Sequence, residues 1–95
     1  MGKYSVYKLP SDILRETADK AKILRKRKGW SQAELARRTQ ISLGSVRRFE
    51  QTGKIAFESL LKIAVVLGRL DDFTAAFAER KEQAELDRMF NETKA

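Results

Sequence analysis

Apolar residues recur at helical spacing in successive segments of this 95-residue chain, and residues that start or stop helices bound each segment. The first segment follows Pro10, where Ser11 is placed to cap a helix that ends in the cationic run 25–28 before Gly29. The charges of that run suit the negative end of the helix dipole. One stripe of the predicted helix consists of Leu14, Thr17, Ala21 and Leu24.

A short second helix is predicted directly after Trp30. Ser31 followed by Glu34 has the spacing of a capping box, in which each residue satisfies a backbone N–H of the other. We expect Ala33, Leu35 and Ala36 to face inward, and the small alanines would allow another helix to approach closely.

A third helix follows a tight connection at residues 40–41. Ser42 is its predicted cap, Val46 and Phe49 face inward, and Gly53 is the stop. Two short helices joined by a turn of about three or four residues form the helix-turn-helix arrangement.

Two further helices are predicted in the C-terminal half. Residues 57–67 carry apolar side chains at helical spacing before Gly68, and a stripe that includes Phe73 and Phe77 predicts another helix to about residue 80. Beyond it the chain is highly charged, and the tail can fray, extend that helix or dock on a partner. Its late apolar cluster consists of Leu86, Met89 and Phe90.

The resulting organisation is one all-α, five-helix domain with two appended ends. Residues 1–10 alternate loosely between apolar and polar positions and form a short extended N-terminal arm or strand. Residues 11–78 form the helix-turn-helix domain, and residues 79–95 form the charged C-terminal tail, either helical or frayed.

Composition narrows the function. The chain has no cysteine and no histidine, which removes disulfides, thiolate metal sites and the commonest general base, so we expect no enzyme activity, no metal and no cofactor. The adjacent pair Asp71 and Asp72 is interpreted as charge at a helix start rather than as a metal site.

Charge is unevenly distributed within the net +7. Residues 1–70 carry 16 basic and 6 acidic side chains, whereas residues 71–95 carry 4 basic and 7 acidic ones. A basic body favours a polyanionic partner, and nucleic acid is the first candidate. No apolar run approaches the roughly 20 residues that span a bilayer. We therefore expect no membrane partner and a cytoplasmic bacterial protein, associated with the nucleoid when it is bound to DNA.

The stretch "LRKRKGWSQAELARRTQISLGSVRRFEQTGK", followed by "ESLLKIAVVLGRLDDF", resembles the XRE family, the helix-turn-helix domains of phage repressor and Cro proteins. The similarity covers residues 21–73 and implies a repressor-like DNA-binding fold. The positions that match the family pattern are Leu24, Arg25, Gly29, Ser31, Gln32, Leu35, Ala36, Ser42, Glu50, Gly53, Leu60, Ile63, Ala64, Leu67 and Gly68.

The resemblance also implies roles for individual residues, because in such domains the helix opened by Ser42 lies in the major groove. Gln32 would anchor a phosphate, Arg48 would read a base, and Arg47 and Lys54 would contact phosphates. The full set of implied DNA contacts is Gln32, Arg38, Ser42, Leu43, Gly44, Arg47, Arg48 and Lys54. Arg25 and Glu50 match the internal ion pair of the family, which would fix the orientation of the recognition helix.

Several positions depart from the family pattern or remain open. Gln40 stands where the family often has glycine, so the turn either accepts a positive φ or differs in geometry. Leu43 and Gly44 stand where polar base-reading residues are common, which leaves a thymine methyl contact and close backbone approach. Arg38 is open between backbone contact and ordinary surface, and Trp30 is interpreted as a packing residue rather than a stacking platform.

The sequence thus predicts a regulator that binds specific double-stranded DNA, most simply a repressor acting as a homodimer on a palindromic operator. One alternative is an antitoxin, as in HipB-like proteins, which represses its own operon and holds a toxin protein. A further alternative is an interaction or RNA-binding module that has lost DNA reading.

Overall fold

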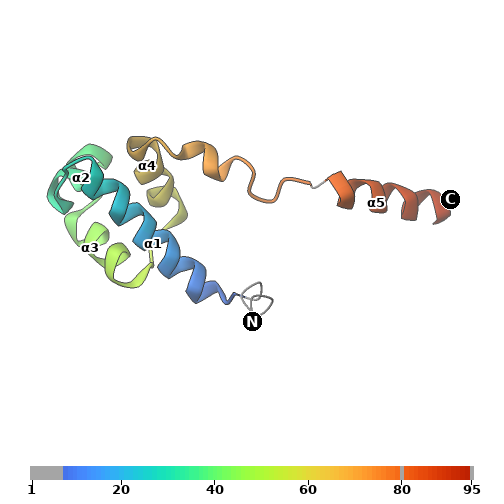
Figure 1. Cartoon of the computed structure of the whole chain (residues 1–95), viewed down its shortest axis with the longest axis horizontal. Helices are drawn as coiled ribbons and strands as arrows, with labels where there is room; N and C mark the ends of the chain where they lie inside the picture. The colour runs from blue at the N-terminus through green and yellow to red at the C-terminus, as the bar shows by residue number, and fades with distance from the viewer. Residues whose placement is uncertain (1–7, 80, 95) are drawn as a thin grey trace.

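The computed structural model describes residues 8–79 and 81–94, and these residues form helices without any strand. Four helices form a bundle, and the last helix projects from it at the end of a connecting segment (Figure 1). The all-α fold is therefore confirmed, whereas most of the predicted N-terminal arm lies outside the described residues. The elements are α1 (Pro10–Arg27), α2 (Gln32–Thr39), α3 (Leu43–Thr52), α4 (Phe57–Leu67), the 3-10 helix η2 (Leu70–Phe73) and α5 (Lys81–Lys94).

Helix α1 begins two residues earlier than the Ser11 cap predicts. Leu9 is the extended N-cap residue, Pro10 is the first helical residue, and the Asp12 carboxylate accepts a 2.9 Å hydrogen bond from the Leu9 N–H. The Ser11 prediction is wrong because proline suits the first helical position, where its fixed φ fits the helix and its missing N–H is not needed.

Serine side chains open both α2 and α3, as predicted. The Ser31 hydroxyl accepts from the Glu34 N–H at 3.0 Å, and the Ser42 hydroxyl accepts from the Ser45 N–H at 3.1 Å. Between the two helices, Gln40 adopts a left-handed conformation with φ 59° and ψ 31°. The turn therefore keeps the positive φ that is usual for glycine and places it on a residue with a side chain.

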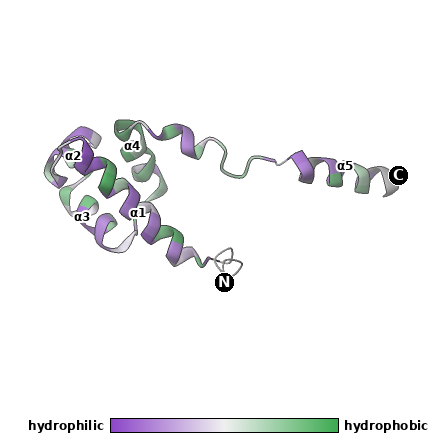
Figure 2. Cartoon of the chain, viewed as in Figure 1, coloured by the Kyte–Doolittle hydropathy of each residue, from purple (hydrophilic) through white to green (hydrophobic). Residues whose placement is uncertain are grey.

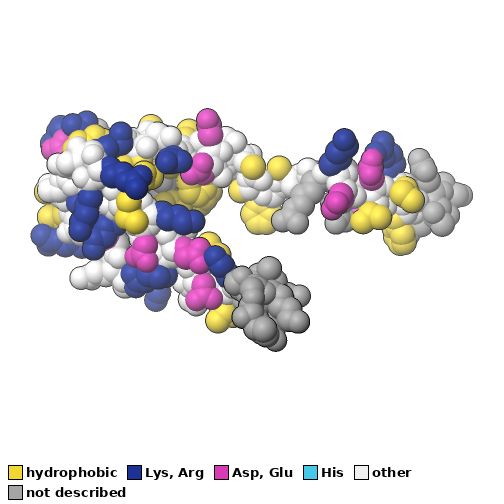
Figure 3. Space-filling view, in the orientation of Figure 1, with side chains coloured by type: hydrophobic (Ala, Val, Ile, Leu, Met, Phe, Trp, Pro, Cys, Tyr) yellow, Lys and Arg dark blue, Asp and Glu magenta, His cyan; other side chains and the backbone are white. Residues whose placement is uncertain are grey.

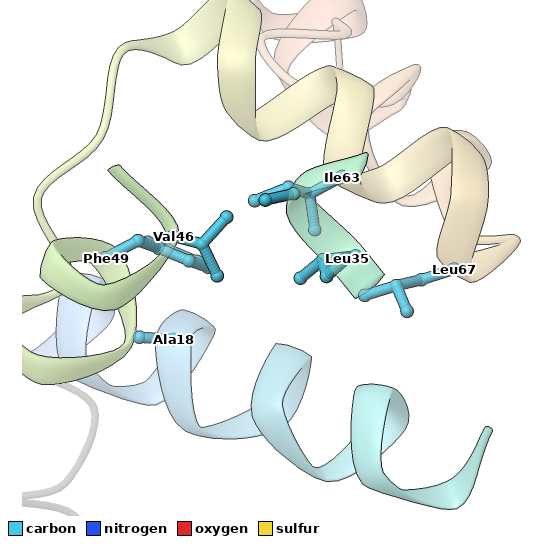
Figure 4. Close-up of a cluster of buried hydrophobic side chains, with 7 residues drawn as sticks. Ala18, Leu35, Val46, Phe49, Ile63 and Leu67 are labelled. Atoms are coloured by element: carbon cyan, nitrogen blue, oxygen red, sulfur yellow. The ribbon is translucent and has the colours of Figure 1, made fainter. Parts of the chain in front are cut away.

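The core lies where α1 to α4 meet (Figure 4). Figure 2 shows that hydrophobic positions are concentrated in α4, which contributes Ile63 and Leu67 to this core. The predicted stripe of α1 is partly wrong, because Leu14 is exposed. The prediction that Ala33 of α2 faces inward is also wrong, because this residue is exposed. The fully or nearly fully buried apolar side chains are Ala18, Leu35, Ala36, Val46, Phe49, Ile63, Ala64 and Leu67.

Helices α1 and α3 approach each other closely at Gly53, the C-cap of α3. Gly53 has φ 82°, and a Cβ atom there would lie 2.7 Å from the Leu14 carbonyl carbon and oxygen. Real Cβ atoms do not come this close to backbone atoms, so the contact requires glycine for its conformation and also for its lack of a side chain.

The helix predicted to run to about residue 80 does not form. Residues 70–73 form η2 instead, residues 74–77 continue in turns, and Phe77 adopts a left-handed φ of 61° that ends helical geometry. Phe73 packs edge-on against Phe57 at 6.0 Å between ring centroids, which anchors η2 to the start of α4. The predicted tail is helical, and it begins afresh as α5 at Lys81.

Candidate nucleic-acid interface

Helix α3 has one buried face and one basic face. Val46 and Phe49 are almost completely buried in the core. Gly44, Arg47 and Arg48 lie on the opposite side by helical spacing, and all three are exposed. We call these three residues the basic face of α3. Burial of the apolar side therefore fixes which way the two guanidinium groups point.

Arg47 and Arg48 make no ion pair or side-chain hydrogen bond with any described residue. Five donors on each guanidinium are thus available to an outside partner. A guanidinium of this kind can bind the O6 and N7 atoms of guanine or two phosphate oxygens at once. The Lys and Arg side chains of the chain are spread over the bundle as a whole, as Figure 3 shows for one of its faces.

Arg48 and Lys54 line one shallow polar groove between α3 and the start of α4, together with Ser45 and Ser59. Lys54 follows the C-cap Gly53, and its backbone N–H donates to the Thr52 hydroxyl at 3.0 Å while its side chain is exposed. The structure therefore brings the expected base-reading arginine and the expected phosphate-binding lysine to the same place.

The orientation of α3 relative to α1 is held by a buried ion pair. Arg25 Nε lies 2.7 Å and Arg25 Nη2 lies 3.0 Å from the two carboxylate oxygens of Glu50, and the Arg25 Nη1 group donates to the Trp30 carbonyl at 2.6 Å. Arg25 and Glu50 are each only 6% exposed. Burial raises the pKa of the Glu50 carboxyl, but the hydrogen bonds from Arg25 and Gln32 outweigh burial, so its pKa lies below the ordinary value of 4.5.

Gln32, the first residue of α2, is engaged inside the protein. Its amide Nε2 donates to Glu50 Oε1 at 2.9 Å, and the residue is half-buried. An amide nitrogen carries two hydrogens, so one N–H remains for a phosphate at the N-terminus of α2. The side chain that would anchor a phosphate is thus held by the same carboxylate that orients α3.

The two arginines late in α2 differ from those of α3 because they are paired. The Glu34 carboxylate binds Arg37 and also Arg38, whose Nε lies 2.7 Å away. The Arg38 guanidinium also stacks on the half-buried Trp30 ring at 4.1 Å from its centroid. Glu34 therefore does not make the reciprocal capping-box bond that the sequence predicts. Arg38 is occupied by intramolecular contacts, and its contribution to DNA contact stays a prediction.

Ser42 and Leu43 have structural contacts of their own. The Ser42 hydroxyl donates to Ser45 Oγ at 2.8 Å in addition to its capping bond, and Leu43 is half-buried against the core. Gly44 is open, since a Cβ atom there would meet nothing within 4 Å. Only part of the Leu43 side chain is therefore available to a thymine methyl, and Gly44 leaves room for close approach.

Sequence reasoning missed two residues at this site. Gln51 is exposed and lies seven residues after Gly44, so its helical spacing places it on the same side as the basic face of α3. Arg15 of α1 donates to the backbone carbonyls of Glu50 and Gln51, where it caps the C-terminal end of α3. The spacing could have revealed Gln51, whereas nothing local to α1 indicates the role of Arg15.

Helices α2 and α3 are short and are joined through residues 40–42, and α3 presents unpaired guanidinium groups. This arrangement defines a helix-turn-helix DNA-binding module. Comparison with known families agrees, because the helix-turn-helix family matches residues 22–73, more than half of the chain. The chain belongs to this family and is a DNA-binding transcription regulator of the XRE type. No curated protein and no solved structure matches the chain significantly.

Within the described part of the chain, every helix is too short or too polar to cross a lipid bilayer.

Proposed function

We propose that this regulator is a repressor that binds a palindromic operator as a homodimer and blocks transcription by occupying it. In each half-site α3 lies in the major groove, Arg48 reads a guanine, Arg47 contacts the flanking backbone, and Lys54 holds a phosphate beyond the end of α3. The observation that carries the proposal is the pair of unpaired, exposed guanidinium groups on a helix whose opposite side is buried.

The charge distribution supports a division between reading and orienting residues. Glu34 offsets one of the two positive charges of the α2 arginines, and Glu50 neutralises Arg25, whereas Arg47 and Arg48 have no such partner among the described residues. The strongest local attraction for a duplex is therefore expected at α3. Gln32 and the free N–H groups at the start of α2 add a phosphate contact on the neighbouring strand.

We expect a dimer because one helix-turn-helix unit contacts only a short stretch of DNA. A single helix-turn-helix unit grips only one half-site, and two-fold dimers of such units bind half-sites about 34 Å apart. A palindromic operator would mirror the two-fold axis of that dimer.

The proposal is tested by selecting duplexes from a random DNA pool with the purified full chain, and by footprinting the DNA upstream of its own reading frame. We expect one palindromic sequence to be enriched and protected. The double variant Arg47→Ala/Arg48→Ala should lose this preference, whereas Lys62→Ala/Arg88→Ala, which removes the same charge from exposed positions outside α3, should keep it. Equal binding of all sequences by the unaltered chain, or an unchanged preference in the arginine variant, would contradict the proposal.

A second candidate is an antitoxin that represses its own operon and holds a toxin through its C-terminal segment. The exposed apolar side chains of α5, which include Leu86 and Met89, favour a protein partner for this segment. Co-expression with the product of the adjacent reading frame tests it, since an antitoxin would relieve growth inhibition by that product. Growth that is unaffected by the adjacent product alone would remove this candidate.

A further inference from the structure

Helix α5 presents an apolar face with acidic side chains beside it. Leu86, Met89 and Phe90 are each about 60% exposed, and their spacing places them on one face. Glu82 lies one turn before Leu86 on the same face, and Glu85 lies at its edge. Figure 3 shows exposed hydrophobic side chains on this helix, well away from the bundle.

Two basic residues of α5 lie away from this face. By helical spacing, Lys81 and Arg88 project from the side opposite Leu86. The apolar face is therefore acidic at its margin although the helix as a whole carries both signs of charge.

The bundle has an apolar groove that α5 does not fill. It runs between α1, α4 and η2, and it shares no residue with the basic face of α3. An occupant of this groove would therefore leave the DNA-binding side free. The apolar side chains that line it include Ala21, Leu24, Leu60, Leu67 and Phe73.

Basic side chains rim this groove. Lys20 and Arg69 line it, and an adjoining hollow shares both residues and adds Arg27 and Ile23. The three cations are exposed and make no ion pair within the described residues, and Asp72 is the acidic side chain among the residues lining the groove. The groove therefore combines an apolar floor with a margin of uncompensated positive charge.

We propose that α5 of one copy of this chain docks in the groove between α1 and α4 of a second copy, and that α5 of the second copy docks in the same groove of the first. The proposal rests on the homodimer of the proposed function and assigns its interface. Apolar side chains of α5 would meet the apolar floor, while Glu82 and Glu85 would meet Lys20 and Arg69.

A second copy fits better than the same copy, because α5 stands away from its own bundle at the end of the connecting segment (Figure 1). Reciprocal exchange about a two-fold axis forms the contact twice, which doubles the buried area without any new surface. The two basic faces of α3 would then be linked in one particle, as a palindromic site requires.

Charge reversal tests this pairing without DNA. One variant carries Glu82→Lys and Glu85→Lys, a second carries Lys20→Glu and Arg69→Glu, and a matched control reverses Lys81 and Arg88 to glutamate on the far side of α5. Sedimentation equilibrium of the full-length chain measures the dimer dissociation constant. We expect each of the first two variants to weaken the dimer by about tenfold or more, or roughly 1.4 kcal/mol, and the control to resemble the unaltered chain.

Mixing the two weakened variants is the decisive step. In a mixed dimer the reversed α5 meets the reversed groove, and the unaltered α5 meets the unaltered groove, so an equimolar mixture should recover a stable heterodimer. Recovery requires both variants to be folded, which excludes misfolding as the cause of the loss.

Several outcomes would overturn the inference. The unaltered chain could stay monomeric, or its dimer dissociation constant could be unchanged by both charge reversals. The mixture could also fail to form the heterodimer, which is the result expected if α5 docks in the groove of its own copy. A chain that stays monomeric would also contradict the homodimer of the proposed function, whereas the other two results concern the interface alone. A recovered dimer that prefers no DNA sequence contradicts the repressor alone, and a chain that selects a palindrome yet ignores the reversals contradicts the interface alone.

Discussion

Arg25 of α1 and Glu50 of α3 form a two-point ion pair, with 2.7 Å and 3.0 Å between the paired atoms, inside a bundle that buries both side chains. Glu50 directly follows Phe49, the largest fully buried side chain, and lies two residues after Arg48. The pair therefore joins the helix that leads into the domain to the helix that presents the basic face. Its geometry ties the direction of Arg47 and Arg48 to the position of α1.

Removal of one partner should be costly. Arg25→Ala leaves the Glu50 carboxylate buried without its main donor, and we expect a loss of about 3–5 kcal/mol in the free energy of unfolding. Replacing both residues with methionine should cost much less, because no uncompensated charge remains. Urea denaturation followed by circular dichroism measures both variants. Equal losses in the single and the double variant would show that packing, rather than charge, holds the two helices.

Acid should weaken the same pair. The pKa of Glu50 in the folded chain lies below 4.5, so its contribution to stability is fully present above that ordinary value and is lost as the pH falls through the lower folded pKa. Glu50→Gln cannot titrate, and its unfolding free energy should depend less steeply on pH below about pH 4.5 than that of the unaltered chain. Parallel stability curves for the two proteins across this range would contradict the assignment.

Gly53 should be far less replaceable than Gly68, although both have positive φ. Alanine at either position incurs the cost of a left-handed conformation, about 1–2 kcal/mol. Only at Gly53 would the new Cβ also meet the Leu14 backbone at 2.7 Å, whereas nothing lies within 4 Å at Gly68. We expect Gly53→Ala to lose about 1–3 kcal/mol more than Gly68→Ala, as overpacked sites do. Equal midpoints of thermal unfolding would show that α1 yields at Leu14 without cost.

Gln40→Gly should stabilise the chain by up to about 1 kcal/mol. The left-handed φ of 59° strains glutamine but not glycine, and the gain is reduced by the larger entropy of glycine in the unfolded state. Gln40→Ala keeps the strain and serves as the control in chemical denaturation. If glycine and alanine behave alike, the Gln40 side chain has a stabilising contact that offsets its strain.

Replacing Arg48 and replacing Lys54 should change DNA binding in different ways, although the two residues line one groove. Arg48→Ala should lose about 1–3 kcal/mol of binding free energy on the operator and relax the preference at one base pair in each half-site. Lys54→Ala should weaken binding to all sequences alike and reduce the salt slope by about one. Titrations on operator and unrelated duplexes at several salt concentrations separate the two. Identical behaviour of the variants would remove the division between reading and anchoring.

Local signals predicted the helix-turn-helix well. Ser31 and Ser42 cap their helices and Gly53 stops α3, because caps and stops depend on a few neighbouring residues. The partners of Glu34 are also local, but spacing alone does not decide between them. Glu34 sits three residues after its cap and could equally bind the cap N–H or the arginines one turn later, and the structure selects the arginines.

The C-terminal third was the least predictable region. Phe73 and Phe77 have helical spacing, but Phe73 packs on Phe57 and Phe77 turns left-handed, so tertiary contact and backbone geometry override the pattern. On α1, hydrophobicity favours the stripe through Leu14, whereas the side that meets α3 runs through the smaller Ala18 and the charged Arg25. A buried arginine cannot be recognised from polarity alone. The family resemblance, rather than hydropathy, indicated it.

The pairing of Glu34 with Arg37 and Arg38 has a consequence for how the protein would search a genome. The single carboxylate offsets one of these two positive charges, so α2 attracts a duplex less strongly than two unpaired arginines would, and encounters at random sequence would be shorter and more easily displaced by ions. Changing Glu34 to glutamine would release that hidden positive charge. The resulting chain would linger on any DNA it met, at the expense of the time left to find its own site.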